Sequence, residues 1–312
     1  MSPPGPRRVS GRRDPEREAR RQARHAIPNA PHAEPTRPKH RARKRFGQHF
    51  LEPAWAAKLV DGLDVSPGDV FIEIGPGLGA LTRPLAATGV AIRAIEVDRD
   101  LAAGIAEWAP PTLTLVTGDF LALDDAGVLP AGDGVVRIVG NLPYNLSTPI
   151  LFRVLALARS TGRVRDAVVM LQREVADRVL AAPGNGDYGP LAVMLGLFAH
   201  RSRLLSLPPG AFRPPPQVHS AVIRLTFRPP PVPVARFEAV DRLVRTAFQQ
   251  RRKTLANALR PLFAARESTG HAPIDVTAVL AGAGIEATRR PETLAAEEFV
   301  RLADTLIPLS VL

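Results

Sequence analysis

Four consecutive residues, Asn141, Leu142, Pro143 and Tyr144, carry groups suited to holding an amine on a flat ring. The Asn141 side chain offers a carbonyl acceptor, and Pro143 stiffens the turn so that the Leu142 carbonyl can point outward. The ring of Tyr144 offers a face on which a nucleobase can stack. A strand-to-loop turn with a half-buried tyrosine explains the same residues, because four-residue matches are common. The remainder of the chain has to distinguish these interpretations.

A glycine-rich stretch, Gly75-Pro76-Gly77-Leu78-Gly79, forms a second candidate site. It follows an apolar run over 70–74 that is typical of a central parallel strand, and it precedes a predicted helix. This order exposes the backbone N–H groups of Gly75 and Gly77 to an anion or polar ligand. Glu96 ends the next predicted strand, 21 residues beyond Gly75. A carboxylate at that interval can accept hydrogen bonds from both ribose hydroxyls.

Asp119 comes just after a third predicted strand, over 113–117, and could accept a hydrogen bond from the adenine amine of a cofactor. The carboxyl ends of the strands of a doubly wound sheet share one edge, so Gly75, Glu96, Asp119 and Asn141 should meet there. Each alone has a structural explanation as a turn glycine, a surface acid, a helix cap or a turn residue. Their joint order favours a ligand site. The G-x-G-x-G spacing favours an adenosine-bearing cofactor without a pyrophosphate.

The composition of the 312-residue chain limits what it can be. Its 45% of hydrophobic residues can fill the cores of one large and one smaller domain. The absence of cysteine excludes disulfides and thiolate metal ligands and suits a reducing compartment, so a cytoplasmic location is expected. We expect no membrane span, because no apolar run reaches roughly 18 residues, and no secretory signal. No metal site is expected either, since no pair of the seven histidines has ligand spacing backed by acids.

The net charge of +11 is concentrated at the N-terminus, where residues 1–45 contain 14 Lys or Arg and 4 Asp or Glu. Residues 1–42 are predicted to be a disordered basic tail, rich in Pro, Arg and Ala. Such a tail attracts phosphate backbones without sequence preference, although a merely solubilising extension would look the same.

The predicted fold is α/β, with a Rossmann-like sheet over 43–228, a proline-rich linker over 229–236 and a small all-helical domain over 237–312. Residues 237–265 have continuous helical spacing, and Arg251, Arg252 and Lys253 lie within it. This basic cluster is expected on a helix, where it could bind RNA, be simply solvated, or dock the two domains.

With these residues laid out, the chain resembles the ribosomal RNA adenine dimethyltransferases, most closely the bacterial 16S (small-subunit) type. The N-L-P-Y-N, P-P-P-x-V and Q-R-R-K-T-L stretches are the most specific. The matching stretches, in family order, are K-R-F-G-Q-H-F-L at 44–51, E-I-G-P-G-L-G at 73–79, I-E-V-D-R-D-L at 95–101, G-D-F at 118–120, N-L-P-Y-N-L-S-T-P-I-L at 141–151, M-L-Q-R-E-V-A-D-R at 170–178, P-P-G-A-F-R-P-P-P-Q-V-H-S-A-V at 208–222, Q-R-R-K-T-L-A-N-A-L at 250–259 and R-P-E-T-L at 290–294.

The resemblance implies a methyltransferase domain that uses S-adenosylmethionine, and N6,N6-dimethylation of two adjacent adenines near the 3′ end of 16S rRNA in an immature small subunit. It implies that the target base is held by Asn141 to Tyr144 and by Phe212 as a second aromatic face. The residues matching the family's cofactor contacts are His49, Leu51, Gly75, Glu96, Asp119 and Asn141. His49 departs from the family pattern, because many relatives carry Asn at this position.

The expected mechanism is orientation of the amine by two acceptors, the Asn141 side chain and the Leu142 carbonyl, without a general base or metal. Stacking would hold a base drawn out of its helix. The expected RNA-binding residues are Arg43, Lys44 and Arg45 together with the basic cluster, and a monomer is expected. Two alternatives stay open. One is a 23S rRNA adenine methyltransferase of the macrolide-resistance type, and the other is a catalytically silent RNA- or DNA-binding assembly or transcription factor on the same fold.

Overall fold

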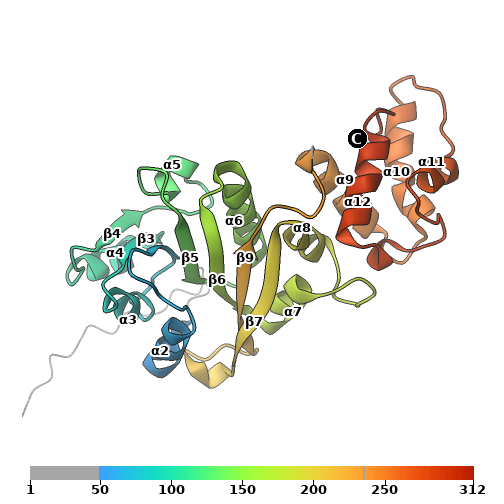
Figure 1. Cartoon of the computed structure of the whole chain (residues 1–312). Coiled ribbons are helices and arrows are strands. Elements are labelled where there is room, and N and C mark those ends of the chain that lie inside the picture. The colour runs from blue at the N-terminus through green and yellow to red at the C-terminus, as the bar shows by residue number, and fades with distance from the viewer. Residues whose placement is uncertain (1–48, 235) are drawn as a thin grey trace, which may run out of the picture. The chain divides into compact units, whose positions relative to one another are not determined.

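The computed structural model describes residues 49–234 and 236–312 (Figure 1). The chain divides between residues 41 and 42, and all described residues belong to the second unit, 42–312. The predicted basic tail and the predicted RNA contacts Arg43, Lys44 and Arg45 lie outside the described residues. Within the described part, no helix is both long and apolar enough to cross a bilayer.

A seven-stranded sheet in the order β4-β3-β2-β5-β6-β9-β7 organises the chain. Neighbouring strands from β4 to β6 are parallel, whereas β9 is antiparallel to both β6 and β7. Its strands are β2 (Val70–Ile74), β3 (Ala91–Glu96), β4 (Leu113–Thr117), β5 (Val136–Asn141), β6 (Val164–Gln172), β7 (Ala199–Leu207) and β9 (Ser220–Phe227). The predicted Rossmann-like α/β fold is therefore confirmed.

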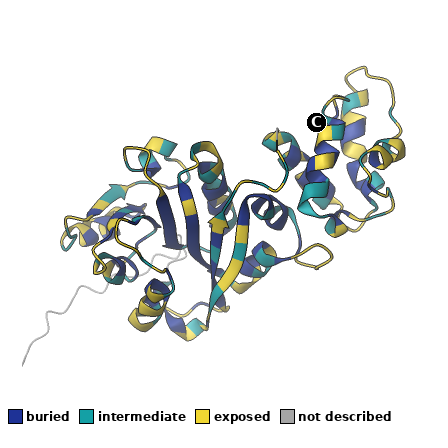
Figure 2. Cartoon of the chain, viewed as in Figure 1, coloured by how far each residue is buried: buried dark blue, intermediate teal, exposed yellow. Residues whose placement is uncertain are grey.

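Helices cover both faces of this sheet, because the side chains of a strand alternate between two cores. In β2, Phe71 packs into one cluster with α2 and α3, and Ile72 packs into the other with α6 and α8. The strands β5 and β6 are almost wholly buried (Figure 2), as their apolar sequences predict. The helices of this part are α2 (Pro53–Asp61), α3 (Thr82–Ala86), α4 (Arg99–Ala106), α5 (Asp125–Val128), α6 (Ser147–Thr161), α7 (Arg173–Leu180) and α8 (Pro190–Phe198).

A second, two-stranded sheet connects the start of the described chain with the proline-rich loop at 208–216. Its strands, β1 (Phe50–Leu51) and β8 (Phe212–Arg213), pair in antiparallel register, with Leu51 opposite Phe212. The short 3₁₀ helix η2 (Pro209–Ala211) leads into β8. A salt bridge between Arg213 and Glu52 and the 2.9 Å bond from the Glu52 N–H to the Ala211 carbonyl extend this connection.

A buried ion network closes the amino end of the sheet. The Arg137 guanidinium, 4% exposed, donates two hydrogen bonds to Asp166 at 2.8 and 2.7 Å and one to Asp69 at 2.9 Å. It also donates to the Leu63 carbonyl at 2.7 Å. Arg165, which is 47% exposed, bonds to the second oxygen of Asp69 at 2.9 Å. This network joins the starts of β2, β5 and β6.

The C-terminal residues form the helices α9 (Phe237–Gln249), α10 (Leu255–Glu267), α11 (Val276–Gly282) and α12 (Ala296–Leu306), with the 3₁₀ helix η3 (Pro291–Thr293) before α12. Their apolar side chains join the same hydrophobic cluster as α6 and α8. The helical part predicted from the sequence is confirmed. Its separation as an independent domain remains a prediction, because residues 42–312 group as one unit.

The continuous helical span predicted for 237–265 is wrong. The backbone leaves the helix at Gln250, with φ −123° and ψ 43°, and α10 begins after the extended residue Thr254. The intervening residues, Arg251 to Lys253, are exposed and offer no apolar side chain to hold a helical turn against the core. The basic cluster therefore lies in a turn rather than on a helix.

Candidate active site

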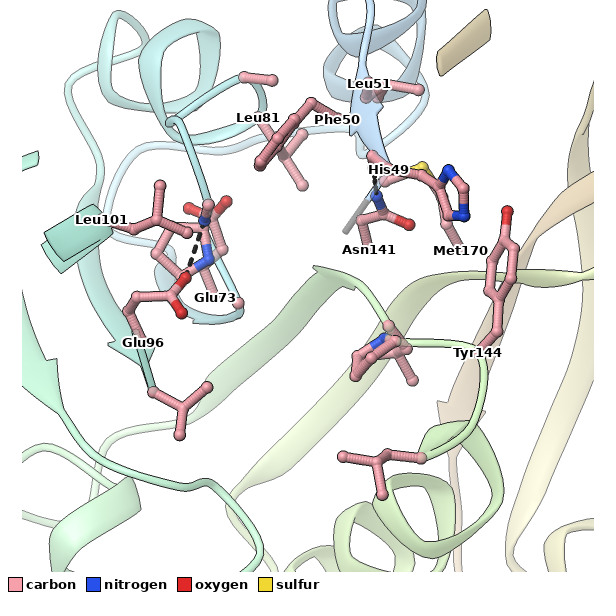
Figure 3. Close-up of a pocket in the computed structure, with 18 of the residues that line it drawn as sticks. His49, Phe50, Leu51, Glu73, Leu81, Glu96, Leu101, Asn141, Tyr144 and Met170 are labelled. Carbon is pink, nitrogen blue, oxygen red and sulfur yellow. Dashed lines mark hydrogen bonds between the residues drawn. The ribbon is translucent and has the colours of Figure 1, made fainter. Parts of the chain in front are cut away.

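Asn141 is the last residue of β5, and the structure orients its amide. The Asn141 Nδ2 donates a 2.7 Å hydrogen bond to the His49 carbonyl, which leaves Oδ1 directed away from that contact (Figure 3). The residue before it must be glycine, because a Cβ on Gly140 would lie 2.6 Å from the Ile74 carbonyl oxygen. Close approach of β2 and β5 thus sets the position of an amide whose oxygen can accept a hydrogen bond.

Several hydrogen bonds hold the turn after Asn141 in place. The Pro143 carbonyl accepts hydrogen bonds from the Leu146 N–H at 2.9 Å and the Ser147 hydroxyl at 3.1 Å. The Tyr144 hydroxyl lies 2.7 Å from the hydroxyl of the buried Ser220 in β9. Burial raises the pKa of Tyr144, so its hydroxyl stays protonated at neutral pH. The ring itself is only half-buried, as a stacking surface requires.

The glycine loop and Glu96 face this turn across the carboxyl edge of the sheet. Gly75, Gly77 and Gly79 have φ values of 67°, 60° and 80°, a region that residues with a Cβ rarely adopt. The Gly77 N–H donates to Glu96 Oε2 at 3.0 Å, and the Asp98 N–H donates to Oε1 at 2.9 Å. Burial raises the pKa of Glu96, although these N–H bonds favour its charged form. Each carboxylate oxygen keeps a further lone pair for a ligand.

One cavity brings most of the predicted residues together (Figure 3). His49 and Leu51 line it from the β1 side, Gly75 and Gly77 from the loop, and Glu96 from β3. The whole platform from Asn141 to Tyr144 lines the cavity beside His49. The cavity is lined by His49, Phe50, Leu51, Glu73, Gly75, Pro76, Gly77, Ala80, Leu81, Glu96, Val97, Leu101, Asn141, Leu142, Pro143, Tyr144, Asn145, Leu146 and Met170.

Asp119 is not brought into this cavity. It follows β4, the edge strand beyond β3, and its side chain is exposed. Its Oδ1 accepts the Leu121 N–H at 2.9 Å, so the carboxylate caps the following turn. The contact between Asp119 and an adenine amine therefore stays a prediction. Because Oδ1 already accepts the Leu121 N–H, Oδ2 would have to accept the hydrogen bond from the amine.

The open aromatic face predicted at Phe212 is not present in this structure. Phe212 is 1% exposed, does not line the cavity, and belongs to the core cluster that contains its β1 partner Leu51. The ring that stacks on Tyr144 is that of His49, with centroids 5.5 Å apart and planes inclined by 25°. Pairing of β8 with β1 turns the phenylalanine inward because its neighbours there are apolar.

Glu73 is a cavity residue that the sequence reasoning missed. It lies in β2, is 1% exposed, and its Oε2 has no hydrogen-bond partner among the described residues. Burial raises the pKa of Glu73 to about 8, and the nearby charge of Glu96 adds to the rise. The sequence contains a feature that could have identified Glu73 as a site residue, because it is the single acid in an otherwise apolar parallel strand.

The basic cluster lies far from the cavity along the chain and does not line it. Arg251 donates a 2.6 Å hydrogen bond to the Gly186 carbonyl in the loop between α7 and α8. Arg252 and Lys253 are exposed. Arg251 thus links the helical part to the sheet part, as one of the alternatives predicted, while the other two side chains are accessible to a ligand.

The α/β fold and the cavity at the carboxyl edge of its sheet suit an enzyme with an adenosine-bearing cofactor, and comparison with known proteins specifies the family. The model of the family described as "Ribosomal RNA adenine dimethylase" matches residues 39–300, and the chain belongs to this family. It is 43% identical over 273 residues to a ribosomal RNA small subunit methyltransferase A of Acinetobacter baylyi, covering 86% of this chain and 94% of the relative. The protein of the same name from Laribacter hongkongensis is 45% identical over 269 residues, with 85% and 96% covered.

Two solved structures share the fold. A dimethyladenosine transferase from Plasmodium falciparum superposes with a TM-score of 0.65 at 23% identity, covering 83% of this chain and 98% of that chain. The 23S rRNA methyltransferase ErmE gives a TM-score of 0.57 at 24% identity, covering 83% and 99%. At these identities the likeness concerns the fold alone and does not distinguish between small- and large-subunit targets.

Proposed function

We propose that this protein is an S-adenosylmethionine-dependent dimethyltransferase that modifies the N6 amines of two adjacent adenines near the 3′ end of 16S rRNA. The observation that carries the proposal is the oriented Asn141 amide, whose acceptor oxygen shares one cavity with the glycine loop and Glu96. The small-subunit names of relatives at 43% and 45% identity support the 16S target over the 23S alternative. An intact cavity argues against a catalytically silent factor.

The cavity suits the proposed cofactor. When bound, S-adenosylmethionine supplies an electrophilic methyl group carried on a sulfonium. The glycine loop lets its backbone approach a ligand closely, and Glu96 presents oxygens that can accept hydrogen bonds from ribose hydroxyls. The residues proposed to hold the cofactor are His49, Leu51, Gly75, Gly77, Glu96, Asp119 and Asn141.

The platform acts by orienting the amine. An adenine amine is a weak nucleophile, because its lone pair is delocalised into the ring. The Asn141 Oδ1 and the Leu142 carbonyl would accept its two hydrogens, which favours a pyramidal nitrogen with its lone pair directed at the reacting carbon. Tyr144 holds the base by stacking, and its hydroxyl bond to Ser220 keeps the ring in place. Pro143 limits the freedom of the turn between these groups.

The RNA-binding surface is proposed to include Arg252 and Lys253 in the turn after α9, since both are exposed and cationic. Arg251 is proposed to contact RNA as well, and its hydrogen bond to the Gly186 carbonyl also holds that turn in place. Contacts of this kind position a substrate through its phosphates, without reading sequence. The enzyme is proposed to act as a monomer on an immature small subunit.

The test is methylation of purified small-subunit particles that lack the two modifications, with large-subunit particles in a parallel reaction. Primer extension should stop at the two adjacent adenines only when enzyme and S-adenosylmethionine are both present. Incorporation confined to 23S rRNA would replace the proposal with the large-subunit alternative. Absence of cofactor binding in calorimetry would favour the silent factor.

A further inference from the structure

The imidazole of His49 occupies one face of the Tyr144 ring. Their centroids lie 5.5 Å apart, and their planes are inclined by 25°. His49 and the Asn141 amide lie on the same side of Tyr144 in Figure 3, and the His49 carbonyl is bonded to the Asn141 Nδ2. The covered face is therefore the one beside the amine acceptor, where the target adenine would have to stack.

There is no room for a base between these two rings. Aromatic planes in contact are separated by about 3.5 Å, so two rings flanking a base need a separation of about 7 Å. The observed 5.5 Å admits direct contact of the two side chains and nothing between them. One of the two rings must move before an adenine can stack on this face of Tyr144.

His49 is the ring that can move. Tyr144 is held at its hydroxyl by Ser220, which is 1% exposed in β9, and at its backbone by the braced turn. The His49 ring is held by a 2.8 Å bond between its Nδ1 and the Pro214 carbonyl, at a solvent-exposed position. Rotation of the His49 side chain breaks this bond and the stack, but it leaves the backbone carbonyl of His49 bonded to Asn141.

We propose that His49 is a positioning residue. Its imidazole stacks on the face of Tyr144 that the target adenine would occupy, and it rotates away when the adenine binds. This inference rests on the proposed function. The His49 ring covers the stacking face in this structure, while the carbonyl of the same residue holds the Asn141 amide in its orientation. The two contributions are separable, because a substitution removes the ring and retains the carbonyl.

Two substitutions at this position should change the KM for undermethylated small-subunit particles in opposite directions. His49→Ala leaves the stacking face open and should lower this KM about two- to ten-fold, the range that corresponds to the energy of one aromatic pair. His49→Phe places another ring on the stacking face of Tyr144, which the base must also displace, and should raise this KM. A raised KM for His49→Ala would make the imidazole a wall of the base site and overturn the proposal, as would equal KM values for all three proteins.

A second measurement does not depend on turnover. In the wild-type protein bound to S-adenosylhomocysteine, the His49 ring protons should show the ring-current shift of Tyr144 in NMR spectra. Adding adenosine monophosphate should move them toward their positions in Tyr144→Leu. Bound nucleotide with unmoved His49 resonances would overturn the proposal even if His49→Ala fails to fold. A wild-type protein that methylates no particle would instead contradict the proposed function.

Discussion

The two ends of the central sheet differ in whether their buried carboxyl groups are paired with a cation. At the amino end, Asp166 and Asp69 are matched by Arg137 through short hydrogen bonds. At the carboxyl end, Glu73 and Glu96 are equally buried, yet no cation forms a salt bridge with either among the described residues. The same strands connect the two ends, so the difference lies in the residues and not in the architecture.

The pKa values follow this difference. Burial opposes ionisation of Asp69, but hydrogen bonds from the Ser66 N–H and Arg137 outweigh it, and the pKa of Asp69 is lowered. Burial raises the pKa of Glu96 and that of Glu73, the latter to about 8. Removing one partner of a buried ion pair destabilises the fold, because it leaves the other charge buried and unpaired. Buried acids without a cation, at a cavity, are a sign of a ligand site.

The largest expected effect is on stability, at the amino end. Arg137→Leu leaves Asp166 and Asp69 buried without their cation, and should lower the free energy of unfolding by about 3–5 kcal/mol in urea denaturation. The matched control is Arg165→Leu, which removes a half-exposed partner of Asp69 and should lower it by less than about 1 kcal/mol. Equal losses in the two variants would contradict a special role for the buried network.

The next effect is on turnover, at the carboxyl end. Asn141→Ala removes one of the two proposed acceptors, and kcat should fall about 10²–10³-fold, as for other preorganised hydrogen-bonding groups. Affinity for S-adenosylmethionine, measured by calorimetry, should change much less. Asn185→Ala, in the loop between α7 and α8, is the control for loss of an amide elsewhere. A kcat for Asn141→Ala within a factor of two of wild type would rule out the platform.

A smaller effect is expected on cofactor affinity. Glu96→Ala removes the carboxylate proposed to accept ribose hydroxyls, and should weaken binding about 10- to 100-fold, since hydrogen bonds to charged groups contribute about 1.5–3 kcal/mol. The comparison variant is Glu107→Ala at the exposed end of α4, which removes an acid outside the cavity. Unaltered affinity in Glu96→Ala would take Glu96 out of the site.

The smallest expected effect is a pH dependence of stability caused by Glu73. Its folded-state pKa of about 8 exceeds the ordinary value of 4.5, so the folded protein binds the proton more tightly. The stability it contributes is full below pH 4.5 and is lost as the pH rises toward 8. Between pH 5 and pH 7, Glu73→Gln should remove on the order of 1–3 kcal/mol of this decline, measured as the free energy of unfolding at several pH values. The exposed Glu267→Gln should leave the decline as it is in wild type.

The residues at the carboxyl edge of the sheet were predictable because the sequence signals for them are local. Glycines at 75, 77 and 79 follow an apolar strand, and their positive φ values are a property of that short stretch. Glu96 and Asn141 each end a strand, and parallel strands deliver their ends to one edge. Asp119 also ends up past its strand, but its place beside the outermost strand keeps it out of the cavity.

Sequence alone therefore determined the mostly parallel α/β sheet, the residues at its carboxyl edge and the family, because periodicity, glycine spacing and motif order are local properties of the chain. Tertiary structure decided that Phe212 is buried, that His49 covers Tyr144, and that Arg137 meets Asp69 and Asp166. Each of these depends on segments that are distant in sequence and close in space, such as β1 against β8. Whether a side chain at such a junction faces solvent or core is set by the partner it meets, and no local pattern encodes that partner.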